Sequence, residues 1–195
     1  MLEEELIMKK KTTTFQLTTI GLMSALVFVS NYLMVNIPVS VGPPTRIHFA
    51  NVFCVLSGLI LGPLGGGLAA GIGSFLFDLT DPLYISGSPF TFVFKFLLAF
   101  VAAKIAYAHG NKADNAKLNF VAAIGGSLTY IVLYLGKTFV DNALLHMEFI
   151  PSLMIVWTKL GASAINATIA VVISVPLCLA IKKALQKSHL LEKLQ

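Results

Sequence analysis

Six apolar segments alternate with polar connections along the chain, and their lengths indicate the class of protein. They lie at Phe15–Met34, Ile47–Leu61, Leu64–Phe77, Phe90–Ala108, Leu118–Val140 and Ser152–Ile181. A helix needs about 20 apolar residues to cross the ~30 Å hydrocarbon core of a bilayer. The second and third segments are short by this measure, whereas the last is long enough to tilt or protrude. The pattern predicts an all-α membrane protein with six transmembrane helices.

Two connections contain strong helix breakers. The sequence GPLGGG at residues 62–67 separates the second and third segments, and Pro with clustered Gly predicts a tight turn there. The connection at residues 36–46 contains Pro43 and Pro44, which prevent a helix. A connection of this length is either a lid or binding element, or a plain connector.

Composition supports a membrane protein and limits what else the chain can hold. Of the 195 residues, 56% are hydrophobic and 12% are charged, and the mean hydropathy is +0.83. Six spans use nearly all of this length, so we expect one transmembrane domain over residues 1–195. Residues 1–13 are expected to be a cytoplasmic N-terminal segment, 14–182 the six-helix bundle, and 183–195 a cytoplasmic tail.

The charged residues predict the orientation in the membrane. Positive charges gather in cytoplasmic loops and termini. The connection between the fourth and fifth segments carries Lys112 and Lys117, and lysines also cluster near both termini. The acidic Asp81 and Glu148 lie in connections on the other side. Both termini are therefore expected in the cytoplasm, and the net charge of +5 reflects this arrangement and not nucleic-acid binding.

Three lysines interrupt apolar segments and indicate a polar cavity. A lysine in the bilayer costs about 2.5–3.5 kcal/mol, so Lys95, Lys137 and Lys159 need compensation. At 1.5 Å per residue they fall in one layer near the external face. They line a pocket for a ligand with a carboxylate, a phosphate or an electron-rich heterocycle, or they snorkel outward and pair with acidic neighbours. Lys137 and Asp141, one helical turn apart, have the spacing for such a pair.

Other polar and aromatic residues map to the same external third. Trp157 fits either a pocket or an interfacial aromatic belt. Asn166, near the middle of the last segment, suits either an inter-helix hydrogen bond or ligand contact. The candidate substrate-binding residues are Arg46, Asn51, Asp78, Tyr84, Lys95, Tyr134, Lys137, Trp157, Lys159 and Asn166.

Small residues in the first segment suggest a packing face. Gly21 and Ala25 are one turn apart, a spacing that lets helix backbones approach closely. This face serves either internal packing or the docking of a partner helix.

Signatures of catalysis are absent from the sequence. It contains no GxSxG, no HExxH, no clustered Cys/His set and no P-loop, so we expect neither an enzyme nor a metal or cofactor site. Cys54 and Cys178 are far apart in apolar runs and are expected to be free thiols.

Several motifs resemble the substrate-binding S components of energy-coupling factor (ECF) vitamin transporters. They are the Gly21-xxx-Ala25 face, the sequence IHFANV at residues 47–52, LILGPLGG at 59–66, and GSFLFDL at 73–79. The family often has Ala-xxx-Ala in the first motif, where this chain has Gly and Ala. The resemblance covers nearly the whole chain.

The resemblance implies a function for the whole chain. It implies a multi-pass protein of a prokaryotic plasma membrane that binds one vitamin or precursor from outside. It further implies that Gly21 and Ala25 dock a transmembrane coupling subunit (the T component), which works with two ATPases. The cationic residues favour an acid such as pantothenate as cargo, with hydroxymethylpyrimidine, pyridoxine or riboflavin as other candidates. The alternative is a free-standing small channel or carrier.

Overall fold

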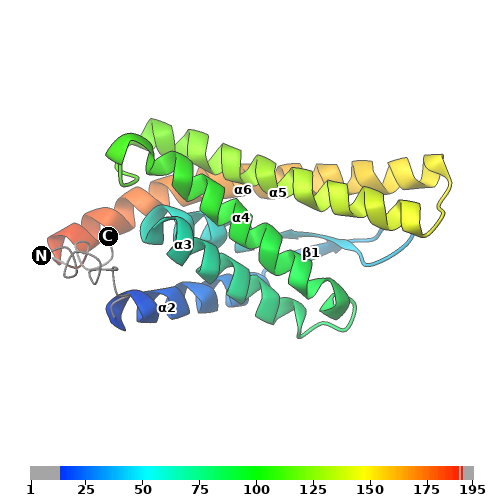
Figure 1. The fold of residues 1–195 in the computed structure, drawn as a ribbon, viewed down its shortest axis with the longest axis horizontal. Coiled ribbons are helices and arrows are strands. Elements are labelled where there is room, and N and C mark those ends of the chain that lie inside the picture. Colours follow the sequence, from blue (N-terminus) through cyan, green and yellow to red (C-terminus); the bar gives the residue numbers. More distant parts are fainter. Residues whose placement is uncertain (1–13, 189, 191–195) are drawn as a thin grey trace, which may run out of the picture.

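The computed structural model describes residues 14–188 and 190, and these fold into a bundle of helices with one short β-hairpin (Figure 1). The α-helices are α2 (Thr14–Ser30), α3 (Ala50–Asp78), α4 (Ser88–Ala106), α5 (Ala116–Leu144) and α6 (Phe149–Lys187). The remaining elements are the strands β1 (Met34–Ile37) and β2 (Thr45–His48) and the 3-10 turns η1 (Ile85–Gly87) and η2 (Ala108–Gly110).

The helix α3 is broken where the sequence predicts a turn. Gly62 has a φ of 76° and a ψ of −176°, a conformation that Gly adopts without steric strain, and Pro63 follows it. The chain then folds back on itself. Two contacts between the arms show this: Ser57 Oγ donates to the carbonyl of Gly66 at 3.0 Å, and Cys54 Sγ lies 3.9 Å from Ser74 Oγ. The two arms, 50–61 and 63–78, therefore pack side by side in opposite directions.

Four helical stretches among the described residues are long and apolar enough to cross a membrane. They are Ala50–Asp78, Ile85–Ala106, Ala116–Leu144 and Phe149–Lys187, and α2 is a shorter apolar helix. The mostly helical membrane class is thus confirmed, whereas six spans and cytoplasmic termini stay predictions. The 39 residues of α6 extend about 58 Å, so this helix exceeds a bilayer core, as its sequence suggested.

The charged residues separate into two ends of the bundle. One end holds the start of α2, the break in α3, the α4–α5 connection and the end of α6 (Figure 1). We call it the basic end, because Lys104, Lys117 and Lys182 lie in these elements. The opposite end, the cavity end, holds the β-hairpin loop and the α3–α4 and α5–α6 connections, with Asp81 and Glu148.

A buried lysine fastens the basic end. The Lys182 residue is 3% exposed, and its Nζ lies 2.9 Å from Asp114 Oδ1 and also donates to the carbonyl of Lys112. Tyr107 donates to the carbonyls of Leu59 and Ile60 beside the break in α3. The helix α6 continues to Lys187, past the predicted domain boundary at 182. The predicted cytoplasmic segment 1–13 lies outside the described residues.

The β-hairpin occupies the connection predicted to be irregular. The strands pair antiparallel, with Asn36 opposite Arg46 and Ile37 opposite Thr45. Correspondingly, α2 ends at Ser30, before the predicted Met34. The prolines Pro43 and Pro44 exclude a helix but permit this arrangement, because they fall in the loop just before β2.

Candidate functional site

A cavity of about 260 Å³ lies at the cavity end, between the β-hairpin, the α3–α4 connection and the helices α4, α5 and α6. Its volume is just below the ~300–1,000 Å³ range of small-molecule sites. Every predicted site residue except Asn51 and Trp157 lines it: Arg46, Asp78, Tyr84, Lys95, Tyr134, Lys137, Lys159 and Asn166. Side chains distant in sequence thus converge on one space.

Arg46, on β2, is held by partners on the α3 side of the cavity. Its guanidinium lies 2.6 Å from an Asp81 carboxylate oxygen and 3.5 Å from one of Asp78. It also stacks over the Tyr84 ring, 3.3 Å from the centroid. The Tyr84 hydroxyl donates to the carbonyl of Pro44. The charge of Arg46 is therefore neutralised, and its contacts fasten the hairpin to the α3–α4 connection.

Asn166, on α6, fastens the other edge of β2. Its Oδ1 accepts from the backbone N–H of His48 at 2.9 Å, and its Nδ2 donates to the carbonyl of Arg46 at 2.8 Å. Thr45 Oγ1 also lies 3.5 Å from the Tyr134 hydroxyl. The sequence suggested either a hydrogen bond to another element or ligand contact for Asn166, and the structure shows hydrogen bonds from α6 to β2.

Lys95, on α4, is buried at the cavity without an ion-pair partner among the described residues. It is 2% exposed, its Nζ donates to Asn51 Oδ1, and the ammonium lies 4.2 Å from the centroid of the Tyr130 ring. Asn51 thus lies behind Lys95 and orients it. An ammonium has three donors, so one amide and one aromatic face leave it with unused hydrogen-bonding capacity.

The other two lysines differ in their partners. Lys137 pairs with Asp141 at 2.5 Å, which confirms the predicted one-turn ion pair. Lys159 Nζ lies 3.3 Å from Thr138 Oγ1 and 5.3 Å from the centroid of the Tyr134 ring. Within residues 14–188 and 190, Lys159 has no carboxylate within ion-pair distance.

Aromatic and hydroxyl side chains complete the cavity, and sequence reasoning missed most of them. Tyr130 and Tyr134 stack on α5 with centroids 5.7 Å apart and ring planes 7° apart. The lining residues absent from the candidate set include Phe90, Phe94, Tyr130, Thr138 and Ser163. Tyr130, Thr138 and Ser163 lie one helical turn from a candidate, so i±4 spacing around Tyr134 and Lys159 was the available signal.

Trp157 does not belong to the cavity. It is 63% exposed, on α6, and is absent from the lining residues. An exposed Trp on a membrane helix fits the interfacial belt that the sequence left open as an interpretation.

Two titratable groups in the connections around the cavity are held neutral. Burial, aided by the charges of Lys95 and Arg46, lowers the pKa of His48 well below its usual value. Its Nδ1 is buried without a hydrogen-bond partner in the described part of the chain. Burial also raises the pKa of Tyr84 to about 12. Neither group changes charge near neutral pH.

The small-residue face of α2 points out of the bundle. Gly21 and Ala25 are exposed, and a Cβ added at Gly21 would meet no atom within 4 Å. Leu22 and Val29 nearby are each 59% exposed. Internal packing therefore does not account for Gly21. By contrast, Gly73 on α3 faces the α2 backbone at Ser24 with no room for a side chain.

Comparisons with known proteins agree with this architecture. A family model described as ECF-type riboflavin transporter, S component, matches residues 11–183. A search of curated proteins found no match. The solved structure titled "Structure and mechanism of the S component of a bacterial ECF transporter" superposes with a TM-score of 0.61 and 23% identity, covering 87% of this chain and 96% of that chain. At this identity the likeness shows the fold alone.

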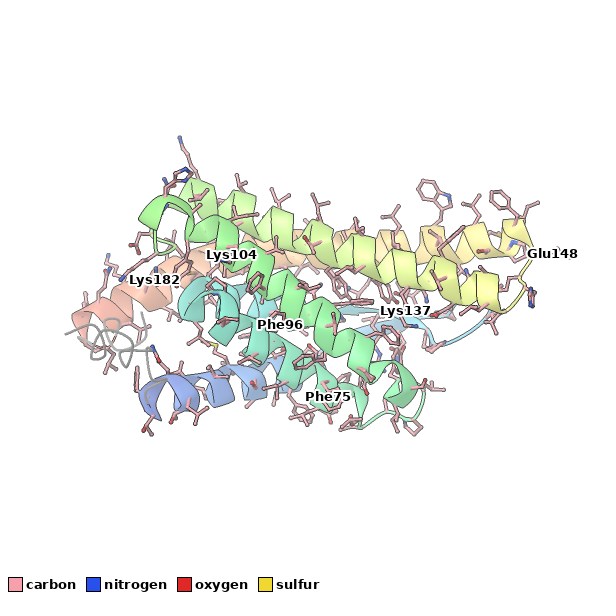
Figure 2. The ribbon with its side chains drawn as sticks, in the orientation of Figure 1. Phe75, Phe96, Lys104, Lys137, Glu148 and Lys182 are labelled. Carbon is pink, nitrogen blue, oxygen red and sulfur yellow. The ribbon has the colours of Figure 1, made fainter. Side chains whose placement is uncertain are left out.

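The family match extends over almost the entire chain and confirms the resemblance noted in its sequence. Figure 2 shows Lys137 and Glu148 at the end of the bundle opposite Lys104 and Lys182, so the cavity and the basic end are distinct regions of this fold. The chain belongs to the family of ECF-type riboflavin transporter S components, which are membrane-embedded substrate-binding subunits of vitamin uptake systems and not enzymes.

Proposed function

We propose that this protein binds a flavin, with riboflavin as the leading candidate, in the cavity between the β-hairpin and α4–α6. The observation that carries the proposal is the combination of aromatic faces with two lysines that lack carboxylate partners. The family match to riboflavin-type S components supports the same cargo.

The charges of the cavity do not require an acidic ligand. Asp78 and Asp81 pair with Arg46, and Asp141 pairs with Lys137, so the excess of cations is smaller than the sequence suggested. The predicted preference for pantothenate is not supported by the family match.

A flavin offers chemistry that each part of the cavity can use. Its flat ring system presents two π-faces, and Tyr130, Tyr134 and Phe90 supply aromatic surfaces for stacking or edge contact. Carbonyl oxygens at the ring edge accept hydrogen bonds, which Lys95 and Lys159 are free to donate. The hydroxyls of a ribityl chain match the polar groups Thr138 and Asp141.

Fluorescence titration of the purified protein tests this assignment. Flavin fluorescence is quenched when the ring stacks on aromatic side chains, so riboflavin should show saturable quenching. Pantothenate and pyridoxine serve as competitors that should not displace it. Absence of quenching, or displacement by pantothenate at similar concentration, would refute a flavin site.

We further propose that the exposed face of α2 docks a coupling subunit, which with its ATPases moves the vitamin inward. The substitutions Gly21→Leu and Ala25→Leu should each prevent the close approach of a helix of the coupling subunit to α2. Uptake should then be abolished while riboflavin binding persists. Gly161→Leu is a matched control, because an added Cβ at Gly161 on α6 also meets no atom within 4 Å. Normal uptake by the Gly21→Leu and Ala25→Leu variants would remove the docking role, and uptake independent of the ATPases would favour a free-standing carrier.

A further inference from the structure

A second cavity lies between the helices α5 and α6, and it shares no lining residue with the first. It has a volume of about 280 Å³ and is lined by Ile124 and Leu128 on α5 and by Ala167, Val171 and Val172 on α6, among others. Ile124 is 47% exposed and Val172 is 60% exposed, so this groove opens on the outer surface of the bundle. In a membrane it opens toward lipid.

Helical register connects this groove to lysines at the basic end. On α5, Lys117, Val121, Ile124 and Leu128 follow an i, i+4, i+7, i+11 pattern and form one stripe. On α6, Val172 and Lys183 have the same i, i+11 relation. Lys117 lies about 10 Å from Ile124 along its helix, and Lys183 about 16 Å from Val172. The apolar groove thus ends in two positive charges.

These two lysines are available to a ligand. Lys117 and Lys183 are exposed, and neither ammonium has a hydrogen-bond or ion-pair partner within the described ranges. Their neighbour Lys182 is different, because it is buried and binds Asp114. Within residues 14–188 and 190, Asp114 is the one acidic residue at the basic end, and it is paired with Lys182. The described part of the chain therefore has no second carboxylate there to neutralise Lys117 or Lys183.

We propose that the α5–α6 groove binds an anionic phospholipid, with an acyl chain along Ile124 and Val172 and the headgroup phosphate between Lys117 and Lys183. Charge complementarity at the end of the groove identifies this occupant. The spacing of about 10–16 Å between the groove and the lysines matches a headgroup at the membrane surface and a chain in the hydrocarbon region. This inference is independent of the vitamin that fills the first cavity.

Native mass spectrometry of the full-length protein with a defined mixture of phosphatidylglycerol and phosphatidylcholine tests the proposal. Phosphatidylglycerol should be retained in excess. A lysine near an anionic lipid is worth about a fivefold preference, so Lys117→Ala and Lys183→Ala should each lower the lipid ratio about fivefold, and together about 30-fold. Lys104→Ala, a matched loss of charge on α4 at the same end, should change it less than twofold.

A second variant tests the groove itself. Ala167→Phe fills the space, so it should reduce the retention of both lipids, with unchanged helix content by circular dichroism as the control for folding. Equal retention of the two lipids, or a ratio that survives in the double lysine variant, would overturn the proposal.

The buried Ser127 Oγ lines this groove without a described partner, a feature that a polar partner helix would use. Cross-linking of Val172→Cys to a coupling subunit, with no lipid retained, would therefore assign the groove to a partner helix and also overturn the lipid site.

Discussion

The two ends of the bundle place lysines in an apolar protein in opposite ways. At the cavity end, lysines from α4, α5 and α6 turn inward onto aromatic rings and a shared space. At the basic end, Lys104, Lys117 and Lys183 are exposed, and only Lys182 among the lysines described there is buried. The same residue type thus lines a cavity at one end and provides surface charge at the other.

The two buried lysines differ in how fully the protein compensates their charge. Lys182 has a carboxylate and a carbonyl, so its charge is compensated within the protein. Lys95 is equally buried but has an amide and an aromatic ring. A buried charge with incomplete compensation is unfavourable unless a ligand supplies the missing contacts.

The largest expected effect is an all-or-none difference in accessibility between the ends. Cysteine introduced at Ser86, in the α3–α4 connection, should react with an impermeant reagent added outside cells. Cysteine at Ala116, at the start of α5, should react only after permeabilisation. Both positions are exposed, and the native Cys54 and Cys178 are buried, so background labelling should be low. Labelling of both sites from the same side of the membrane would contradict the predicted placement of the two ends on opposite sides.

Next in size is the loss of ligand affinity at the cavity end. Removing a charge-assisted hydrogen bond costs about 1.5–3 kcal/mol, so Lys95→Met or Lys159→Met should weaken riboflavin binding roughly ten- to a hundredfold. Met keeps the apolar stem of the side chain. Calorimetry on these variants should be compared with Lys104→Met, on α4 but at the basic end, which should bind normally. Equal affinities in all three folded variants would make the cavity lysines structural.

Lys182→Met should show the opposite pattern, with lower stability and normal binding. The change removes hydrogen bonds to Asp114 and to the Lys112 carbonyl, and it should lower the free energy of unfolding by about 1–3 kcal/mol. Thermal unfolding in detergent would measure the loss. A weaker affinity for riboflavin at unchanged stability would contradict the division of roles between the ends.

The smallest effect is expected at Lys137. Its ammonium is already paired with Asp141, and both side chains are partly exposed, so the pair is worth about 1 kcal/mol or less. Lys137→Met should change affinity less than about fivefold. A loss as large as that of Lys95→Met would show that the ion pair opens to contact the ligand.

Hydrophobic segments and helix breakers were sufficient to predict the helices and the turn at Gly62. The β-hairpin escaped prediction because its strands are short and two prolines precede β2, so no run of alternating residues marks it. Its pairing is stabilised by Arg46 and Asn166, whose partners are remote in sequence. A local pattern contains no information about such contacts.

The sequence was sufficient to place the cationic residues of the candidate site, but not to show which way each side chain points or which residues support it. Depth along each helix placed Lys95, Lys137 and Lys159 in one layer, and all three line the cavity. Depth does not give the direction in which a side chain points around its helix, so Trp157 at the same level faces outward. The supporting role of Asn51 also depends on how α3 packs against α4, which spacing within one helix cannot show.

The break at Gly62 has a consequence for how the chain enters the membrane during synthesis. Residues 50–78 form one continuous apolar stretch of 29 residues, which inserted as a straight helix would cross the bilayer once. Folded back at Gly62 and Pro63, the same stretch returns to the side from which it started. This single turn therefore decides whether residues 50–78 cross the membrane once or twice. The orientation of α4, α5 and α6, and with it the side on which the cavity opens, depends on that number of crossings. A substitution that straightened it would invert every later helix without touching a residue of the site.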